Sequence, residues 1–268
     1  MTSNGQYTKR VTASVGEVCR AAYRFVFPPC CPLCHGEQAS GSLRIQGQFV
    51  TPVLCDDCAA EIVPPRENRC RRCGLSLGPF ITSDDGCPSC VPRQFRFDRV
   101  IRLGTYDDFM RDACIRGKAP HMQPLSAALA NLLWLTEQAD FEAVGIDLVV
   151  PVPRHWTRRV LREHHQAETL SRVLAKRLKR PHVRTLLRKV RLTPDQSDLP
   201  AAQRKENLRK AFAVSFVGRR IIANKTVLLV DDILTTGTTA NECARTLLQA
   251  GAKQVVVAVL AVVPAVRR

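Results

Sequence analysis

The sequence predicts an α/β protein with a parallel sheet, preceded by a small zinc-ribbon domain. Strand-length apolar runs alternate with helical patterns from about residue 98 onward, which is typical of a parallel sheet. Ahead of them lies a cysteine-, proline- and glycine-rich stretch that contains four C-x-x-C pairs. We therefore expect a tail and helix over 1–28, a double zinc-ribbon segment over 29–97 and the α/β domain over 98–268.

Charge and hydropathy narrow the class of protein. Among 268 residues, Lys and Arg number 40 and Asp and Glu 24, which gives a formal net charge of +16. This balance favours anionic partners such as nucleic acid, an acidic membrane face or phosphorylated small molecules. No apolar run reaches the roughly 20 residues of a membrane span, and no signal-peptide core is present at the N-terminus. We expect a cytoplasmic protein without a membrane span, and its oligomeric state stays open.

The first expected element is a short amphipathic helix over residues 11–27. Apolar residues recur there at spacings of three and four, and the pattern stops at Pro28 and Pro29. A helix that packs on the rest of the fold is the favoured interpretation. A helix on a membrane surface is the alternative, because basic residues flank it.

Eight of the twelve cysteines form the C-x-x-C pairs. They are Cys31/Cys34, Cys55/Cys58, Cys70/Cys73 and Cys87/Cys90. Each pair presents two sulfurs on one turn, so two pairs complete a tetrahedral zinc site and four pairs make two sites. We expect neighbouring pairs to combine in sequence order, although interleaved pairing is compatible with the spacing and Cys30 is an alternative to Cys31. The expected role is structural, with contact to nucleic acid or a protein partner as an added role.

The C-terminal part is expected to alternate strands and helices. Strands are predicted over "FDRVIRLGTY", which alternates, over "GIDLVVPVP", near "AFAVSF", over 226–230 and over "QVVVAVLAVV". Helices are predicted over "MQPLSAALANLLWLTEQ", "HQAETLSRVLAKRLKR" and "TANECARTLLQAGA", the last ending at Gly251. A polar loop is expected over 191–209. Cys114 and Cys243 are expected to be ordinary buried thiols.

The strand over 226–230 runs into a loop that suits an anion. Asp231 and Asp232 end the strand, and Thr235, Thr236, Thr238 and Thr239 surround Gly237. The following helix start offers backbone N–H groups to a phosphate, and Gly237 lets the backbone approach it. The two carboxylates would repel that phosphate, so we expect them to face sugar hydroxyls or Mg²⁺. A phosphate beside vicinal hydroxyls describes a ribose 5-phosphate.

Three other interpretations of this loop have less support. A Walker B strand would require a G-x-x-x-x-G-K-[ST] loop, and a dinucleotide site would require G-x-G-x-x-G; the chain contains neither. Two acids after a strand can also simply cap a helix. That interpretation leaves the threonine-rich loop unexplained.

The stretch "VLLVDDILTTGTTA" resembles the motif with which type I phosphoribosyltransferases bind 5-phosphoribosyl 1-pyrophosphate (PRPP). The whole chain resembles the ComF family through "CPLC", "CRRCG", "GIDLVVPVPRHWTRRVLREHHQAETLSRVLA" and "RKVRLTPDQSDLPAAQRKENLRKAF". The resemblance implies a parallel-sheet type I phosphoribosyltransferase fold, with structural Zn²⁺ in the ribbon and Mg²⁺ accompanying PRPP.

The resemblance also implies roles for individual residues. Asp231 and Asp232 would bind the ribose hydroxyls, and the loop from Thr235 to Thr239 the 5-phosphate. Arg154 begins the expected pyrophosphate loop. The catalytic assignments are Lys118, near the phosphate end, and Arg188 and Arg191 in a mobile loop over 188–207 that also holds Gln196, Arg204 and Asn207.

One segment departs from the family pattern. Where the family usually has R-G-F-N-Q, this chain has Arg162-Glu163-His164-His165-Gln166. Glu163 adds a negative charge beside the expected pyrophosphate site and replaces a glycine.

We therefore expect a phosphoribosyltransferase that acts on an unidentified nitrogen acceptor. The alternative is a PRPP-sensing or DNA-associated competence factor with little catalysis, whose partners are single-stranded DNA or competence proteins. A zinc-ribbon protein that only binds nucleic acid is a third hypothesis, and the basic stretch over 154–191 is compatible with it.

Overall fold

A computed structural model describes most of the chain. It covers residues 30–36, 43–45, 48–50, 54–63, 68–78, 86–154, 164–191 and 210–264. The helix expected over 11–27, most of the loop expected over 191–209, and Glu163 lie outside the described residues.

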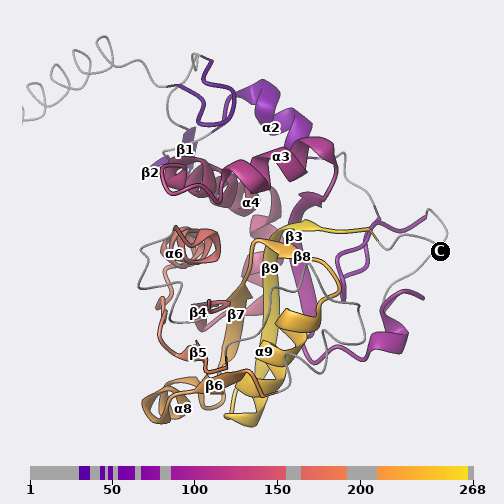
Figure 1. Ribbon diagram of the computed structural model, residues 1–268, viewed down its shortest axis with the longest axis vertical. Helices are drawn as coiled ribbons and strands as arrows, with labels where there is room; N and C mark the ends of the chain where they lie inside the picture. Colours follow the sequence, from indigo (N-terminus) through magenta and orange to yellow (C-terminus); the bar gives the residue numbers. More distant parts are fainter. Residues whose placement is uncertain are drawn as a thin grey trace, which may run out of the picture.

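A parallel sheet forms the centre of the molecule (Figure 1). Its strand order is β3-β9-β7-β4, and the short β8 pairs with β9. The strands are β3 (Arg99–Thr105), β4 (Leu148–Pro151), β7 (Thr226–Val230), β8 (Ile233–Leu234) and β9 (Gln254–Val262). All strand pairs in this sheet are parallel. The predicted parallel α/β architecture is therefore confirmed.

The strands are buried on both faces. All five residues of β7 are buried, and so are the five central residues of β3. The strand predicted over "FDRVIRLGTY" is therefore confirmed as β3, and its burial does not alternate because elements cover both faces of a parallel sheet.

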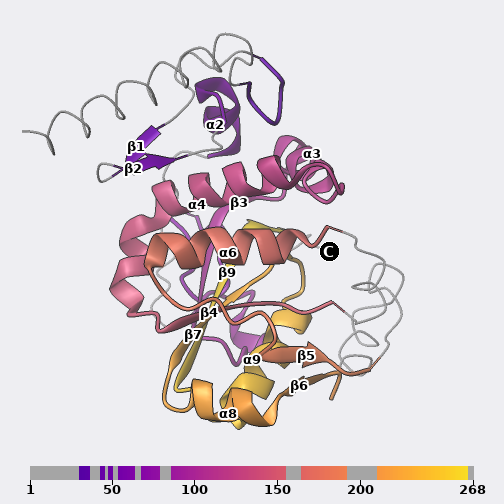
Figure 2. The ribbon, with the colours of Figure 1, turned by 90° about the vertical axis from the view of Figure 1, so that its left-hand side faces the viewer.

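Helices α3 (Asp108–Arg116), α4 (Gln123–Val144) and α6 (Gln166–Leu178) lie on one side of the sheet (Figure 2). Helix α9 (Thr238–Gln249) packs on the other, and α8 (Phe216–Ile222) adds its buried Ile222 to the same core. The helices predicted from periodicity correspond to α4, α6 and α9. Helix α3 was not expected; it is short, and the Asp107 carboxylate caps it by accepting from Met110 N at 3.0 Å.

A two-stranded ribbon lies beside the sheet. Its strands β5 (Leu187–Lys189) and β6 (Phe212–Val214) are antiparallel. Strand β6 is the one expected near "AFAVSF", and β5 was not expected. Residues 190–211 connect the two strands, and 192–209 of them lie outside the described residues.

The cysteine-rich part contains β1 (Leu43–Ile45), β2 (Gln48–Val50), α2 (Asp56–Ile62) and the 3₁₀ helix η1 (Val91–Arg93). The sequence showed little helical periodicity here, because the seven residues of α2 are too few to establish one. Two aspartates in its first turn favour the helix through its dipole.

The two halves of this part join different cores. Cys31 and Cys58 pack in the core that holds α3 and α4. The core that holds α9 includes Cys70, Cys73, Cys87 and Cys90. In the parts of the chain that the structure describes, no helix is long and apolar enough to cross a membrane.

Candidate functional site

The eight C-x-x-C cysteines form two clusters. The first cluster contains Cys31, Cys34, Cys55 and Cys58, and the second contains Cys70, Cys73, Cys87 and Cys90. Within each cluster the sulfurs lie within 4.8 Å of one another. This is the grouping in sequence order, and Cys30 lies outside it with an exposed side chain.

The sulfur separations match a tetrahedral zinc centre. The distances between sulfurs are 3.6 Å for Cys34–Cys55, 3.8 Å for Cys70–Cys90 and 3.5 Å for Cys73–Cys87. Four sulfurs placed about 2.3 Å from one Zn²⁺ stand about 3.8 Å apart. All described cysteines are free thiols rather than disulfides. The donor set and its spacing therefore fit zinc.

The thiols also need a cation for electrostatic reasons. Burial raises the pKa of Cys90 to about 11, and the neighbouring Cys70 adds to the shift. Burial likewise raises the pKa of Cys58 and of Cys73 far above that of a free thiol. Four thiolates are unfavourable together in so small a volume unless a divalent cation neutralises them.

The acidic pair lies at the carboxyl end of β7, where ligands bind in open parallel sheets. Both side chains are partly exposed. The Asp231 carboxylate accepts from the backbone N–H of Asp232 at 2.9 Å, and the Asp232 carboxylate accepts from that of Ile233 at 2.9 Å. These bonds fix the orientation of both carboxylates at the strand end.

Lys118 lies against this pair, with its Nζ 3.0 Å from Oδ2 of Asp232. Burial and the charge of Asp232 raise the pKa of Asp231 well above its ordinary value. For Asp232 burial acts upward too, but the Lys118 ammonium outweighs it and the pKa is lowered. Burial works against the charge of Lys118, yet Asp232 raises its pKa overall. The site therefore holds an ionised Asp232 beside an Asp231 that is harder to ionise.

A chain of hydrogen bonds connects Lys118 with the end of β4. Arg154 Nη1 donates to the carbonyl of His164 at 3.2 Å, and His164 Nε2 lies 3.2 Å from Ser126 Oγ. Ser126 Oγ donates to the carbonyl of Gly117 at 2.9 Å. These bonds run from the end of β4 to Gly117, the residue that precedes Lys118 in the chain.

His164 is buried. Burial lowers its pKa, and the charge of Arg154 contributes in the same direction. The imidazole is therefore neutral at pH 7, and protonated donation to a phosphate is disfavoured.

Gln166 is a further residue of interest at the start of α6. It is buried, and neither Nε2 nor Oε1 has a hydrogen-bond partner. Its amide lies so close to Gly117 that a Cβ built there would be 2.3 Å from Nε2. Only its position in the R-G-F-N-Q segment pointed to it from the sequence.

The threonine loop joins β8 to α9. Gly237 is the N-cap of α9 with φ +76°, and the hydroxyls of Thr236 and Thr238 are 2.8 Å apart. Thr235 is exposed, and Thr238 and Thr239 form the first turn of the helix. The loop thus puts hydroxyls and a helix N-terminus next to the acidic pair in the chain.

Arg188 and Arg191 do not belong to the segment from β7 to α9 that holds the acidic pair and the threonine loop. Arg188 is an exposed residue of β5, and Arg191 follows that strand with an exposed side chain. They belong to the ribbon whose connection, residues 192–209, lies outside the described residues.

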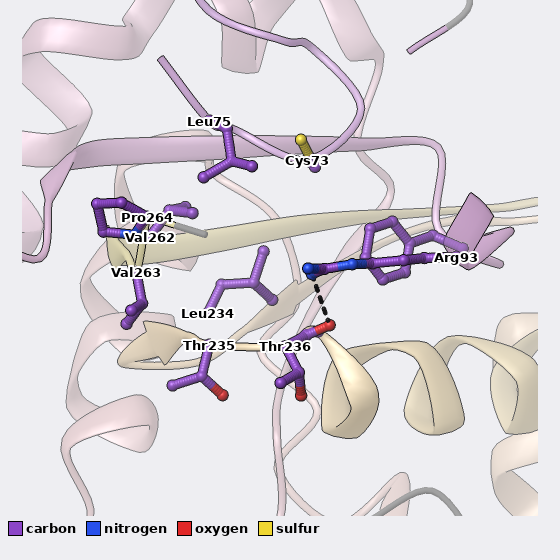
Figure 3. Close-up of a pocket in the computed structure, with 11 residues that line it drawn as sticks. Cys73, Leu75, Arg93, Leu234, Thr235, Thr236, Val262, Val263 and Pro264 are labelled. Carbon is purple, nitrogen blue, oxygen red and sulfur yellow. Dashed lines mark hydrogen bonds between the residues drawn. The ribbon is translucent and has the colours of Figure 1, made fainter. Parts of the chain in front are cut away.

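A cavity of about 370 Å³ lies on one side of the threonine loop (Figure 3). Its walls come from the loop, from the end of β9 and from the second cysteine cluster. Neither aspartate lines it. Arg93 and Phe95 do, and the sequence held no signal for either residue.

Comparison with known proteins covers most of the chain. Residues 165–267 match the family described as "Phosphoribosyl transferase domain". The DNA utilization protein YhgH of Salmonella typhi is 30% identical over 210 residues, which span 75% of this chain and 87% of that protein. Competence protein F of Haemophilus influenzae is 28% identical over 205 residues, with the same shares.

Solved structures give a weaker match. The glutamine PRPP amidotransferase of B. subtilis, complexed with ADP and GMP, is 21% identical with a TM-score of 0.34, over 52% of this chain and 27% of that one. The chain therefore spans about a quarter of that protein.

The match to the domain family, the parallel sheet and the two N-terminal Cys₄ clusters agree with one another. A relative at 30% identity across most of its length settles the assignment. This chain belongs to the ComF/YhgH family, with a phosphoribosyltransferase domain behind two Cys₄ clusters.

Proposed function

We propose that the protein binds PRPP with Mg²⁺ and transfers the phosphoribosyl group to a nitrogen acceptor. The observation that carries the proposal is the end of β7, where two oriented carboxylates precede a threonine loop at the N-terminus of α9. Carboxylates accept from ribose hydroxyls, and the helix start attracts a phosphate.

Different residues would bind different parts of PRPP. Asp231 and Asp232 would hold the ribose hydroxyls, and the loop from Thr235 to Thr239 the 5-phosphate. Lys118, which pairs with Asp232, and Arg154, which follows β4, would supply positive charge to the phosphate groups of PRPP. The two partly exposed carboxylates are suitable oxygen donors for Mg²⁺, which would neutralise charge on the departing pyrophosphate.

The reaction breaks the bond between the anomeric carbon and the pyrophosphate oxygen, and a nitrogen lone pair forms the new bond. Positive charge develops on the ribose and negative charge on the leaving group. Lys118, Arg154 and the arginines of the ribbon, Arg188 and Arg191, would stabilise the leaving group. Closure of the ribbon over the substrate would exclude water, which otherwise hydrolyses PRPP.

Calorimetry tests the binding step. The unmodified chain should bind PRPP in the presence of Mg²⁺, and the double variant Asp231→Asn, Asp232→Asn should not. Asp112→Asn is a matched control, because Asp112 is an exposed carboxylate on α3 whose bond among the described residues is local, to Arg116 at 3.4 Å. Its affinity for PRPP should equal that of the unmodified chain. Equal binding by the double variant would refute the assignment of the pair.

Pyrophosphate release across a panel of nucleobases and amines tests the transfer step. One acceptor should increase the release rate well above that with water alone. Release that no acceptor changes would favour the second candidate, a PRPP-responsive factor in DNA handling with little catalysis.

One feature of the surface supports that second candidate. Helix α8 exposes Phe216, Val217 and Ile221, and the Arg220 guanidinium lies 5.4 Å from the centre of the Phe216 ring. Aromatic faces next to arginines suit stacking on single-stranded nucleic acid. The names of the relatives, competence protein F and DNA utilization protein, point in the same direction.

A further inference from the structure

The segment that follows the second cysteine cluster lies against the threonine loop. Cys90 is followed at once by η1, where Arg93 N donates to the Cys90 carbonyl at 3.0 Å, and then by Phe95. Arg72, from the other half of the cluster, donates to the Phe95 carbonyl at 2.9 Å. Both halves of the cluster therefore hold this segment in place.

Phe95 packs directly on Gly237. A Cβ built on Gly237 would lie 2.8 Å from the Phe95 ring, so no larger residue fits unless the ring moves. The ring itself is stacked on Phe97, with centroids 4.6 Å apart, and is buried. The backbone of the loop thus rests on a fixed aromatic surface.

Arg93 determines which way the peptide group between Thr236 and Gly237 faces. Its Nη1 donates to the carbonyl oxygen of Thr236 at 3.4 Å, while the Thr236 hydroxyl points to the other side (Figure 3). In a trans peptide the C=O and the following N–H point in opposite directions. The bond from Arg93 therefore directs the N–H of Gly237 toward the side of the Thr236 hydroxyl, where the phosphate would bind.

The cavity makes these two supports important. Apart from its contacts with Arg93 and Phe95, the threonine loop borders a cavity of about 370 Å³ on this side instead of packed side chains. A loop with so little packing behind it depends on its few contacts. A third contact lies one residue beyond Phe95, where the backbone N–H of Arg96 donates to Asn241 Oδ1 on α9 at 2.6 Å.

We propose that Arg93 and Phe95 are positioning residues for the 5-phosphate, and that the second Cys₄ cluster must hold its metal for them to act. The first cluster packs in the other core and is not part of this support. The inference rests on the proposed binding of PRPP and adds a dependence of that binding on one of the two metal centres.

The proposal is tested by comparing the binding of ligands that contain the 5-phosphate with the binding of one that lacks it. Ribose 5-phosphate and PRPP both contain the 5-phosphate, whereas inorganic pyrophosphate does not. Arg93→Ala and Phe95→Ala should each lower the affinity for ribose 5-phosphate and for PRPP about tenfold. This is the range for the loss of one hydrogen bond to a charged group. The affinity for pyrophosphate should stay unchanged. Arg93→Lys should recover part of the loss. Arg96→Ala, which removes the same charge from an exposed neighbour, should bind like the unmodified chain.

The metal dependence is tested with a pair of cysteine variants. Cys87→Ser with Cys90→Ser should lose one zinc and weaken ribose 5-phosphate binding, while Cys34→Ser with Cys55→Ser should lose one zinc and keep it. Elemental analysis measures the zinc lost, and a cooperative thermal transition shows that the sheet of each variant is folded.

The outcomes separate this inference from the proposed function. Failure of the unmodified chain to bind PRPP would overturn both. Normal ribose 5-phosphate binding by Arg93→Ala and Phe95→Ala, or an equal loss of pyrophosphate binding, would overturn this inference alone.

Discussion

At the scale of single residues, the site depends on how charge is distributed between the two aspartates. Lys118 lowers the pKa of Asp232, whereas burial and the Asp232 charge raise the pKa of Asp231. The Lys118–Asp232 pair is partly exposed, with side-chain exposures of 40% and 21%. Such a pair contributes about 1 kcal/mol or less to stability, so its main effect is on ionisation.

Replacing Lys118 should therefore make PRPP binding sensitive to pH. In Lys118→Met, burial raises the pKa of Asp232 without an ammonium to oppose it, so that acid protonates this carboxylate more readily. Affinity for PRPP should then fall as the pH is lowered from 8 to 6, and change less in the unmodified chain. Calorimetry at both pH values measures this. Parallel pH profiles would contradict the role given to Lys118.

One buried and one half-buried histidine make stability depend on pH. Burial lowers the pKa of His164 and of His182 below 6.5. The unfolded chain then binds more protons than the folded chain as the pH falls below that value, so the free energy of unfolding decreases. A histidine pKa that is lower by one in the folded chain than in the unfolded chain costs about 1.4 kcal/mol of stability in acid.

Urea unfolding at pH 7.5 and 5.5 checks this expectation. The double variant His164→Gln, His182→Gln should lose less stability between the two pH values than the unmodified chain. Gln keeps a polar group near Ser126 and Ser171, which the two imidazoles contact. An unchanged difference would show that the histidines do not titrate as described.

At the scale of elements, the sequence predicted what periodicity and motif spacing encode. Helices α4, α6 and α9 and strands β3, β4, β7 and β9 repeat apolar residues over enough positions to be recognised. Helices α2, α3 and α8 and strand β5 are too short for such a pattern. The grouping of the cysteines followed from chain proximity, since a C-x-x-C turn meets the nearest other turn.

The candidate site was predictable in part. The acids and threonines are consecutive in the chain, so one strand, loop and helix bring them together. Arg93, Phe95 and Ser126 reach the site only through tertiary packing. No local pattern distinguishes them from other residues of their type.

Removing one cysteine turn should unfold one part of the molecule. Cys70→Ser with Cys73→Ser should reduce bound zinc from about two to about one per chain, because two thiolates rarely retain zinc. Residues 68–97 should become sensitive to proteolysis while the sheet stays folded. Elemental analysis and mass spectrometry of the fragments measure both effects. A chain that retains all of its zinc would contradict the grouping of these ligands.

At the scale of the whole molecule, the net charge of +16 is compatible with the proposed binding of the anionic PRPP. The exposed residues of α6 include Arg172 and Lys176, although Arg177 on the same helix bonds Asn131 Oδ1 at 2.9 Å. The basic residues therefore serve both packing and surface charge. The exposed ones add to the positive potential of the surface, which attracts anions.

Single-stranded DNA should accordingly bind with an affinity that falls as salt rises. Each phosphate contact contributes a slope of about −0.7 in a plot of log affinity against log salt. Arg219→Ala with Arg220→Ala on α8 should reduce the slope by about 1.4, two such contacts. Fluorescence anisotropy at several salt concentrations measures it. A slope that the double variant leaves unchanged would exclude α8 as the contact surface.

A crystal structure of the chain with PRPP and Mg²⁺ tests the central claim most directly. The account predicts the 5-phosphate at the loop from Thr235 to Thr239 and the ribose hydroxyls within hydrogen-bond distance of Asp231 and Asp232. Sugar density located away from the end of β7, with both carboxylates out of its reach, would contradict it.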